Sequence, residues 1–293
     1  MKYSIVMAAF WSALGVVGIA QIPATTGTQP ADTAQGAGET KAQAAPAPAV
    51  DPAVRKILDS LEAAGAKHTT IRADVVYEII NITLGDSEKR TGWVCYQKEK
   101  TVTRKNKKHT EPAKMRFHFA TLQQGKGPIR ANKVDYALDR EFFTEAKETL
   151  KTVTRYQLPP RSNQQQEPEL MKIGKGPFPL PFGQKTADMI RYFDCTTRPV
   201  RQYDPKGSVY LKLVPRKEYS KEFNFHYIQM WIDRKTYLPV KVVSRDKAKN
   251  ITTVTFANVE TDLKFEGKLF LIPKPPGWKL IVVLLEPGTN LRP

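Results

Sequence analysis

The sequence SVYLKLVPRKEYSKEFNFHYIQMWIDRKTYLPVKVVSRDKAKNITTVTFANVETD spans residues 208–262 and decides the fold. Aromatic and β-branched residues gather in four short runs, at 209–214, 223–233, 238–243 and 250–259, which suit a pleated, half-buried surface. Turn residues separate the runs, as at 233–236. Strands this close along the chain pair antiparallel, because a parallel return needs a crossover of about a dozen residues. The stretch therefore predicts an antiparallel meander.

The chain is strongly basic. Its 293 residues carry 46 Lys and Arg against 29 Asp and Glu, a net charge of +17. Residues 1–50 contain two residues of each sign, so the whole excess lies on residues 51–293. A basic surface favours anionic partners such as nucleic acid, phospholipid headgroups or acidic polysaccharide. The alternative is a solvated surface that keeps the protein soluble.

The N-terminus has the order of an export signal. Lys2 precedes an apolar run at 5–20 that ends in the small residues of Gly18-Ile19-Ala20. We expect residues 1–20 to be a cleaved signal peptide and the protein to be periplasmic or secreted. An uncleaved membrane anchor is the competing interpretation. Residues 21–50 are rich in Ala, Pro and Thr and cannot bury enough surface to order themselves, so they are expected to form a disordered tether.

An amphipathic helix is expected at the start of the folded part. Asp51 suits the N-cap, Pro52 the first helical position, and Gly65 the helix end. Apolar residues recur between them at helical spacing. They are Val54, Ile57, Leu58 and Leu61. This stripe requires a partner surface.

Period-two alternation follows the helix and predicts a first set of strands. The expected strands are 71–80, 93–96, 114–119, 134–138, 142–143 and 150–158. In 114–119 the apolar side chains point one way and the basic ones the other. One face of the sheet is therefore expected to be apolar and the other to carry positive charge.

An irregular segment separates the two sets of strands. Residues 161–176 are polar and Gln-rich, and residues 176–183 are apolar with too many prolines for a regular element. A short helix at 186–191 and an extended run at 192–197 lead into the meander. We find no internal repeat, and we expect residues 51–293 to form one domain.

This order of parts resembles the LolA-like superfamily, which includes LolA, LolB and RseB. More narrowly, YQLPP at 156–160, FG at 182–183, KTYLP at 235–239 and PPGWKL at 275–280 resemble landmarks of a planctomycete-type LolA-like domain. The resemblance covers roughly residues 51–285. It implies an α+β, mostly antiparallel fold: a curved half-open barrel with an N-terminal amphipathic helix and a short helical, Phe/Pro-rich lid. Its concave apolar face would hold acyl chains.

Motifs of catalysis are lacking in the sequence. There is no Gly-x-Ser-x-Gly elbow, no His-Glu-x-x-His and no Walker loop, and the four histidines stand apart. We therefore expect no enzyme activity, no metal and no cofactor. Nucleic acid is not expected as a partner, because the aromatic residues are not interleaved with the lysines as a stacking platform requires.

Basic residues crowd one predicted hairpin. They are Lys100, Arg104, Lys105, Lys107 and Lys108. This cluster is expected to touch an anionic membrane or cell-wall polymer, and the alternative is a solvated loop.

The function expected from the residues and the resemblance is binding of lipid or acylated protein in an apolar concave face. The residues expected to line it are Leu58, Leu61, Met115, Phe117, Phe119, Tyr136, Leu138, Phe178, Leu180 and Phe182. Two alternatives remain: a stress regulator of the RseB type with an envelope protein as partner, and an envelope scaffold that binds through its basic surface.

Cys95 and Cys195 are the only cysteines. In an oxidising compartment they could form a disulfide. Because both fall within expected strands, two separate buried thiols are the alternative.

Overall fold

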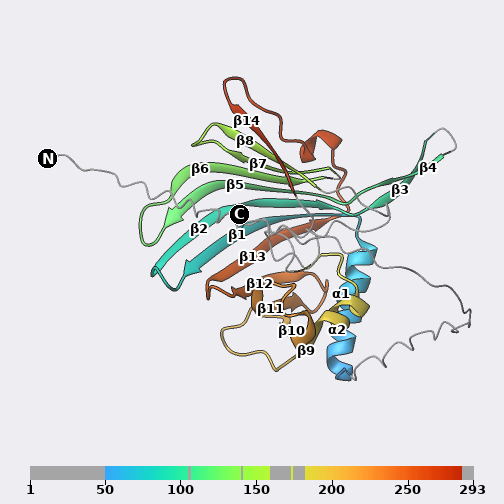
Figure 1. The fold of residues 1–293 in the computed structure, drawn as a ribbon. Coiled ribbons are helices and arrows are strands. Elements are labelled where there is room, and N and C mark those ends of the chain that lie inside the picture. Colours follow the sequence, from blue (N-terminus) through green and yellow to red (C-terminus); the bar gives the residue numbers. More distant parts are fainter. Residues whose placement is uncertain (1–49, 105–106, 140, 159–172, 174–181, 286–293) are drawn as a thin grey trace, which may run out of the picture. The chain divides into compact units, whose positions relative to one another are not determined.

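A computed structural model describes residues 50–285, except 105–106, 140, 159–172 and 174–181 (Figure 1). These residues belong to one compact unit, Pro46–Pro293. The expected signal peptide and almost all of the expected tether lie outside the described residues. None of the described helices is both long and apolar enough to cross a membrane.

The first helix, α1, spans Pro52–Lys67. The carboxylate of Asp51 accepts a hydrogen bond of 2.7 Å from the backbone N–H of Ala53, which confirms the expected N-cap. The helix continues past Gly65, so the prediction that this glycine ends it is wrong. Gly65 instead allows close packing, because a Cβ there would lie 3.3 Å from the backbone nitrogen of Gly183.

The strands follow the expected order, and most extend further than predicted. The first set is β1 (Thr70–Asn81), β2 (Asp86–Gln97), β3 (Lys100–Arg104), β4 (Lys107–Glu111), β5 (Lys114–Gln124), β6 (Arg130–Leu138), β7 (Phe142–Lys147) and β8 (Thr152–Gln157). The second set follows helix α2 (Thr186–Tyr192) and consists of β9 (Phe193–Thr196), β10 (Ser208–Pro215), β11 (Phe225–Asp233), β12 (Pro239–Asp246), β13 (Ile251–Thr261) and β14 (Lys279–Leu284). Two short 3₁₀ turns lie at Lys217–Tyr219 and Gly267–Phe270.

Twelve of the described strands, from both sets, join in one sheet in the order β14-β8-β7-β6-β5-β2-β1-β13-β12-β11-β10-β9, and β3 and β4 pair with each other in a separate two-stranded sheet. The predicted meander of residues 208–262 is confirmed as β10 to β13, all paired antiparallel. Antiparallel pairing of β1 with β13 links the two sets, and Tyr77 lies opposite Val254. The strand β14 pairs parallel with β8 and is the exception. The sheet stays open, since β14 and β9 are its two edges.

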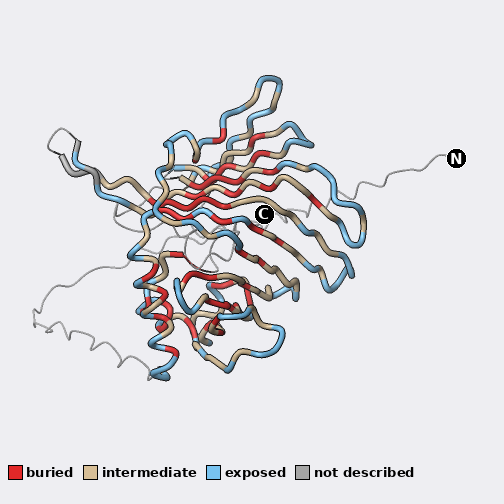
Figure 2. The backbone as a smooth tube through the Cα atoms, turned by 180° about the vertical axis from the view of Figure 1, so that it is seen from behind, coloured by how far each residue is buried: buried red, intermediate tan, exposed pale blue. Residues whose placement is uncertain are grey.

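The inner face of the sheet is the face that packs against α1 and α2. Buried side chains from both helices and from most strands form one core cluster on this face. Figure 2 shows burial concentrated in the middle of the strands and falling toward the hairpin tips. The turns after β1, β5 and β7 lie at one end of the strands, which we call the hairpin end. Helix α1 joins β1 at the opposite end, which we call the α1 end. The open, mostly antiparallel architecture expected from the sequence is confirmed.

A strap, residues 263–278, covers part of the outer face. The Arg116 guanidinium on β5 donates to the carbonyl of Leu269 at 2.9 Å, and Arg155 on β8 donates to the carbonyl of Ile272 at 3.5 Å. The Ile272 side chain packs on small apolar side chains of β6, β7 and β8, in a second cluster. The outer face therefore has an apolar patch in addition to the expected basic residues.

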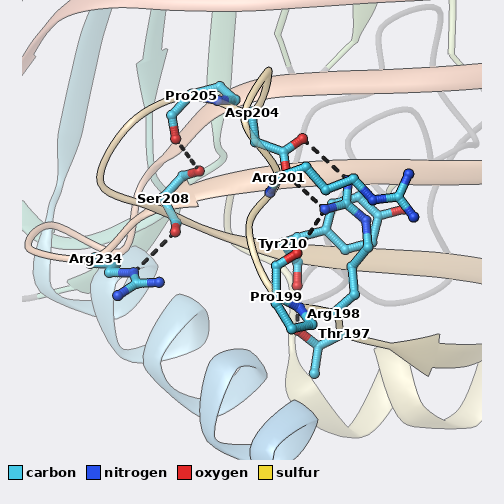
Figure 3. Close-up of polar contacts among 9 residues, drawn as sticks. All are labelled: Thr197, Arg198, Pro199, Arg201, Asp204, Pro205, Ser208, Tyr210 and Arg234. Atoms are coloured by element: carbon cyan, nitrogen blue, oxygen red, sulfur yellow. Dashed lines mark hydrogen bonds and ion pairs between the residues drawn. The ribbon is translucent and has the colours of Figure 1, made fainter.

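A buried carboxylate holds the loop between β9 and β10 (Figure 3). Asp204 accepts hydrogen bonds from Arg198 at 2.6 and 3.2 Å and from the backbone N–H of Arg201 at 2.7 Å. The Arg198 guanidinium also lies 3.7 Å from the ring centre of Tyr210 on β10. These contacts fix the loop on the outer face of the second set of strands.

Both cysteines are free thiols, so the disulfide between Cys95 and Cys195 is not formed in this structure. Five strands of the sheet separate β2, which carries Cys95, from β9, which carries Cys195. With neighbouring strands about 4.8 Å apart, this separation far exceeds the reach of a disulfide.

Candidate ligand-binding face

The apolar floor of the inner face is made by the residues that the sequence singled out. All of the described ones are buried in the main core cluster: Leu58, Leu61, Met115, Phe117, Phe119, Tyr136, Leu138 and Phe182. Period-two alternation places the members on β5 and β6 side by side, with Phe117 opposite Tyr136 and Met115 opposite Leu138. Phe178 and Leu180 lie outside the described residues.

An aromatic belt crosses the inner face on the side of this floor nearest the hairpin end, and it shares Phe119 and Tyr136 with the floor. Its rings belong to five strands: Tyr77 on β1, Phe119 on β5, Tyr136 on β6, Phe143 on β7 and Tyr156 on β8. Ring centres along the belt lie 5.6, 6.3, 6.0 and 6.0 Å apart in that order. These separations fall in the range of favourable aromatic pairs, so the belt adds packing energy beyond simple burial.

Gly92 on β2 makes the belt continuous. It lies in the inner-face row of β2, between Val75 of β1 and Phe119 of β5. A bulge at this point brings the neighbouring backbone so close that a Cβ on Gly92 would lie 1.8 Å from the carbonyl oxygen of His118. Only glycine fits, and its missing side chain lets the Tyr77 and Phe119 rings meet across β2.

A polar girdle lies between the belt and the hairpin end. Arg90 on β2 lies opposite Tyr77, pairs with Glu88, and reaches across β5 to donate to the Asn132 side chain on β6 at 3.1 Å. On β7, Lys147 forms an ion pair of 2.8 Å with Glu145. We define the girdle as Glu88, Arg90, Asn132, Glu145 and Lys147. Its side chains are partly shielded: those of Arg90 and Glu145 are 15% and 12% exposed.

The tyrosine hydroxyls of the belt are held in the protonated form. Burial, reinforced by the negative charge of Glu88, raises the pKa of Tyr77 well above its usual range. Burial and then Glu145 also raise the pKa of Tyr136 well above its usual range, and the same two causes raise the pKa of Tyr156. Tyr136 also hydrogen bonds to Glu145. At neutral pH these hydroxyls are therefore hydrogen-bond donors.

The inner face is thus amphipathic along the strands. Along β2 and along β5 to β7, from the α1 end toward the hairpin end, it passes from the apolar floor through the aromatic belt to the charged and amide groups of the girdle. Such a surface matches a molecule with an apolar chain and a polar end.

A metal-holding cluster and a reactive thiolate are both absent from the described residues. No three His, Cys, Asp or Glu side chains within the described ranges lie close enough to hold a metal ion. Burial raises the pKa of the Cys95 thiol to about 11 and that of Cys195 to about 12, so neither is a nucleophilic thiolate at neutral pH.

The basic residues expected to contact an anionic surface lie on the β3–β4 hairpin, which extends the β2–β5 pair. Lys100 forms an ion pair of 3.3 Å with Glu111. The backbone of Arg104, Lys107 and Lys108 lies on these two strands, and Lys105 lies outside the described residues. Their contact with an anionic partner stays a prediction.

The polar girdle was not predicted from the sequence. The expected strand at 93–96 covers only the last part of β2, so Glu88 and Arg90 were not placed on a face. Residues two apart on a strand share a face, and Val94 points inward. Extending the strand back through Gly92 would therefore have placed Arg90 and Glu88 on the inner face. In the same way, Glu145 and Lys147 are in phase with Phe143.

Comparisons with known proteins concern the fold. No family model and no curated protein matches the sequence. An uncharacterised conserved protein from Thermus thermophilus matches with 12% identity and a TM-score of 0.43, over 78% of this chain and 99% of that one. A Pseudomonas aeruginosa MucA/MucB complex matches with 15% identity and a TM-score of 0.38, over 75% and 61%. A LolA superfamily protein from Nitrosomonas europaea matches with 9% identity and a TM-score of 0.31, over 75% and 97%.

The architecture that the LolA-like resemblance implies, an open and mostly antiparallel sheet whose inner face packs against helices, is confirmed. The narrower resemblance to a planctomycete-type domain stays a prediction.

Proposed function

We propose that this chain is an exported, non-enzymatic binding protein that holds a lipid or an acylated protein against the inner face of its sheet. The observation that supports the proposal is the layering of that face, from apolar floor through aromatic belt to polar girdle. The alkyl chain lies on the floor and the polar end at the girdle. Binding is reversible burial of the chain, with no covalent step.

The energetics of this mode of binding are sufficient. Each buried CH₂ contributes about 0.8 kcal/mol, so a chain of about sixteen carbons supplies roughly 13 kcal/mol. With about 4 kcal/mol lost on association, the remainder corresponds to a Kd of about a micromolar or lower. Aromatic rings that line the path add contact area at little cost in side-chain entropy.

The proposal also includes export of the protein from the cytoplasm. The signal peptide is removed near Ala20, and the protein works in the periplasm or outside the cell. An envelope protein that delivers or receives the cargo is the expected partner.

A pair of adjacent substitutions on β1 tests the proposal. Ile79 points to the inner face, where it is partly buried against the core, whereas Ile80 points to the outer face and is 37% exposed. Ile79→Asp places a charge on the proposed binding face, and Ile80→Asp is the matched control. Phe117 is less suitable, because its side chain is fully buried and an Asp there would test folding.

The measurement is saturable uptake of a fluorescent acyl probe and of a lipopeptide by purified protein. Wild type and Ile80→Asp should bind alike, and Ile79→Asp should bind at least tenfold more weakly, with circular dichroism unchanged. If wild-type protein takes up neither probe, the proposed function is wrong.

A further inference from the structure

The charges of the polar girdle are balanced within it. The Arg90 guanidinium is engaged by the Glu88 carboxylate and by the amide oxygen of Asn132. The Lys147 ammonium is engaged by the Glu145 carboxylate. An incoming anion would have to compete with a carboxylate already in place for each of these two cations, and it would lose part of its hydration in doing so.

On β7 the carboxylate of Glu145 lies nearer the belt than the ammonium of Lys147, whereas on β2 Arg90 lies opposite Tyr77 and Glu88 lies one inner-face row farther from the belt. Tyr136 lies directly opposite Glu145 on the neighbouring strand and hydrogen bonds to it. In agreement with this contact, Glu145 raises the pKa of Tyr136 more than Arg90 lowers it. The polar end of a ligand beside Tyr136 therefore meets the acceptor oxygens of Glu145, while both cations of the girdle are already paired with carboxylates.

We propose that the inner face selects ligands whose polar end is uncharged and donates hydrogen bonds, such as the hydroxyls of a glyceride or the amides of an acylated peptide, over ligands that end in a carboxylate or phosphate. This inference rests on the proposed function and specifies its ligand class. Hydroxyl and amide donors satisfy the Glu145 oxygens without bringing in a second negative charge. An anionic end is repelled by the same oxygens at close range.

The selectivity is opposite to the one expected from the net charge of the chain. A charge of +17 attracts anionic amphiphiles to the surface over long distances. Salt screens that attraction with a Debye length of about 5–6 Å at 0.3 M, whereas contacts on the partly shielded inner face are screened less. A measurement in 0.3 M NaCl therefore reports the site rather than the surface.

The experiment compares three probes with the same alkyl chain: 1-monolauroylglycerol, laurate and dodecyl phosphate. Each displaces a fluorescent acyl probe from the full chain at pH 8.5 in 0.3 M NaCl, below the concentration at which micelles form. Wild-type protein should bind monolauroylglycerol roughly tenfold more tightly than laurate or dodecyl phosphate, as one close like-charge contact in a partly shielded site implies.

Two isosteric variants identify the source of the selectivity. Glu145→Gln removes the charge at the belt, keeps an acceptor for Tyr136, and should strengthen laurate binding several-fold, whereas monolauroylglycerol, which loses a charged acceptor, should bind no more tightly than it does to wild type. Glu148→Gln removes the same charge from the exposed β7–β8 turn, where Glu148 pairs with Lys133 at 3.6 Å, and should leave both affinities unchanged.

The outcomes separate this inference from the proposed function. If the fluorescent probe and all three amphiphiles fail to bind, both the proposed function and this inference are wrong. If they bind but laurate or dodecyl phosphate binds as tightly as monolauroylglycerol, only the inference is overturned. It is also overturned if Glu145→Gln and Glu148→Gln have the same effect on laurate.

Discussion

Replacement of Asp204 by Asn should destabilise the fold, because this carboxylate holds the β9–β10 loop (Figure 3). Asp204 is 7% exposed and Arg198 is 23% exposed, so the ion pair between them is largely shielded. Hydrogen bonds from Arg198, and then from the backbone of Arg201, hold the pKa of Asp204 well below its usual range in spite of its burial. Asn keeps the shape but removes the charge that Arg198 requires.

The expected loss is about 2–4 kcal/mol at pH 7. Hydrogen bonds to charged groups contribute about 1.5–3 kcal/mol each, and breaking a buried pair costs about 3–5 kcal/mol. Because Arg198 keeps some access to water, the lower part of that range applies. Asp194→Asn is the matched control: Asp194 is 63% exposed and lies 3.5 Å from Arg216, so its loss should cost less than about 1 kcal/mol.

The pH dependence has a definite sign. Because the pKa of folded Asp204 is lowered, its stabilisation is fully present above the unfolded value of about 3.9 and is lost as the pH falls toward the folded value. Urea unfolding at pH 7 and pH 3, followed by tryptophan fluorescence, measures the free energy of unfolding. The difference between wild type and Asp204→Asn should be smaller at pH 3. A variant as stable as wild type at pH 7, or an equal difference at both pH values, would refute the reasoning.

Three further predictions follow from other parts of the chain. Gly92→Ala should cost about 2–3 kcal/mol of unfolding free energy in urea titrations, because its Cβ meets backbone, whereas Gly267→Ala, with open space around it, should cost little; equal costs would contradict the packing at the bulge. Alkylation of unreduced, unfolded protein should label both cysteines, and the folded protein should react slowly at pH 8 because burial raises both thiol pKa values. Mass spectrometry of protein from the native envelope should find a mature N-terminus close to Gln21, whereas intact Met1 in the membrane fraction would indicate an anchor.

The sequence alone determined the elements of this fold, because they depend on short-range patterns. The cap at Asp51 and the stripe of Val54, Leu58 and Leu61 produce α1. Alternation such as that of 114–119 produces strands with an apolar face, and short connections force the antiparallel meander of residues 208–262. The floor of the proposed binding face was predicted from the sequence for the same reason. All its members are large apolar residues that follow the periodicity of their helix or strand.

The tertiary structure decided how distant parts meet. Pairing of β1 with β13 joins the two sets of strands, and parallel pairing of β14 with β8 ends the sheet; both connect residues far apart in the chain, which no local pattern specifies. Gly65 has the signature of a helix end in sequence, but it serves as a contact point with Gly183.

The polar girdle shows the difference most clearly. Arg90 and Glu145 break the apolar alternation of their strands, so a local pattern treats them as solvent-facing or as the end of a strand. In the fold, pairing with the neighbouring strands places Arg90 opposite Tyr77 and Glu145 opposite Tyr136. Partial burial there strengthens the electrostatic interactions of both side chains. Register and burial are properties of the assembled sheet, and they turned isolated charged residues into the polar rim of an apolar face.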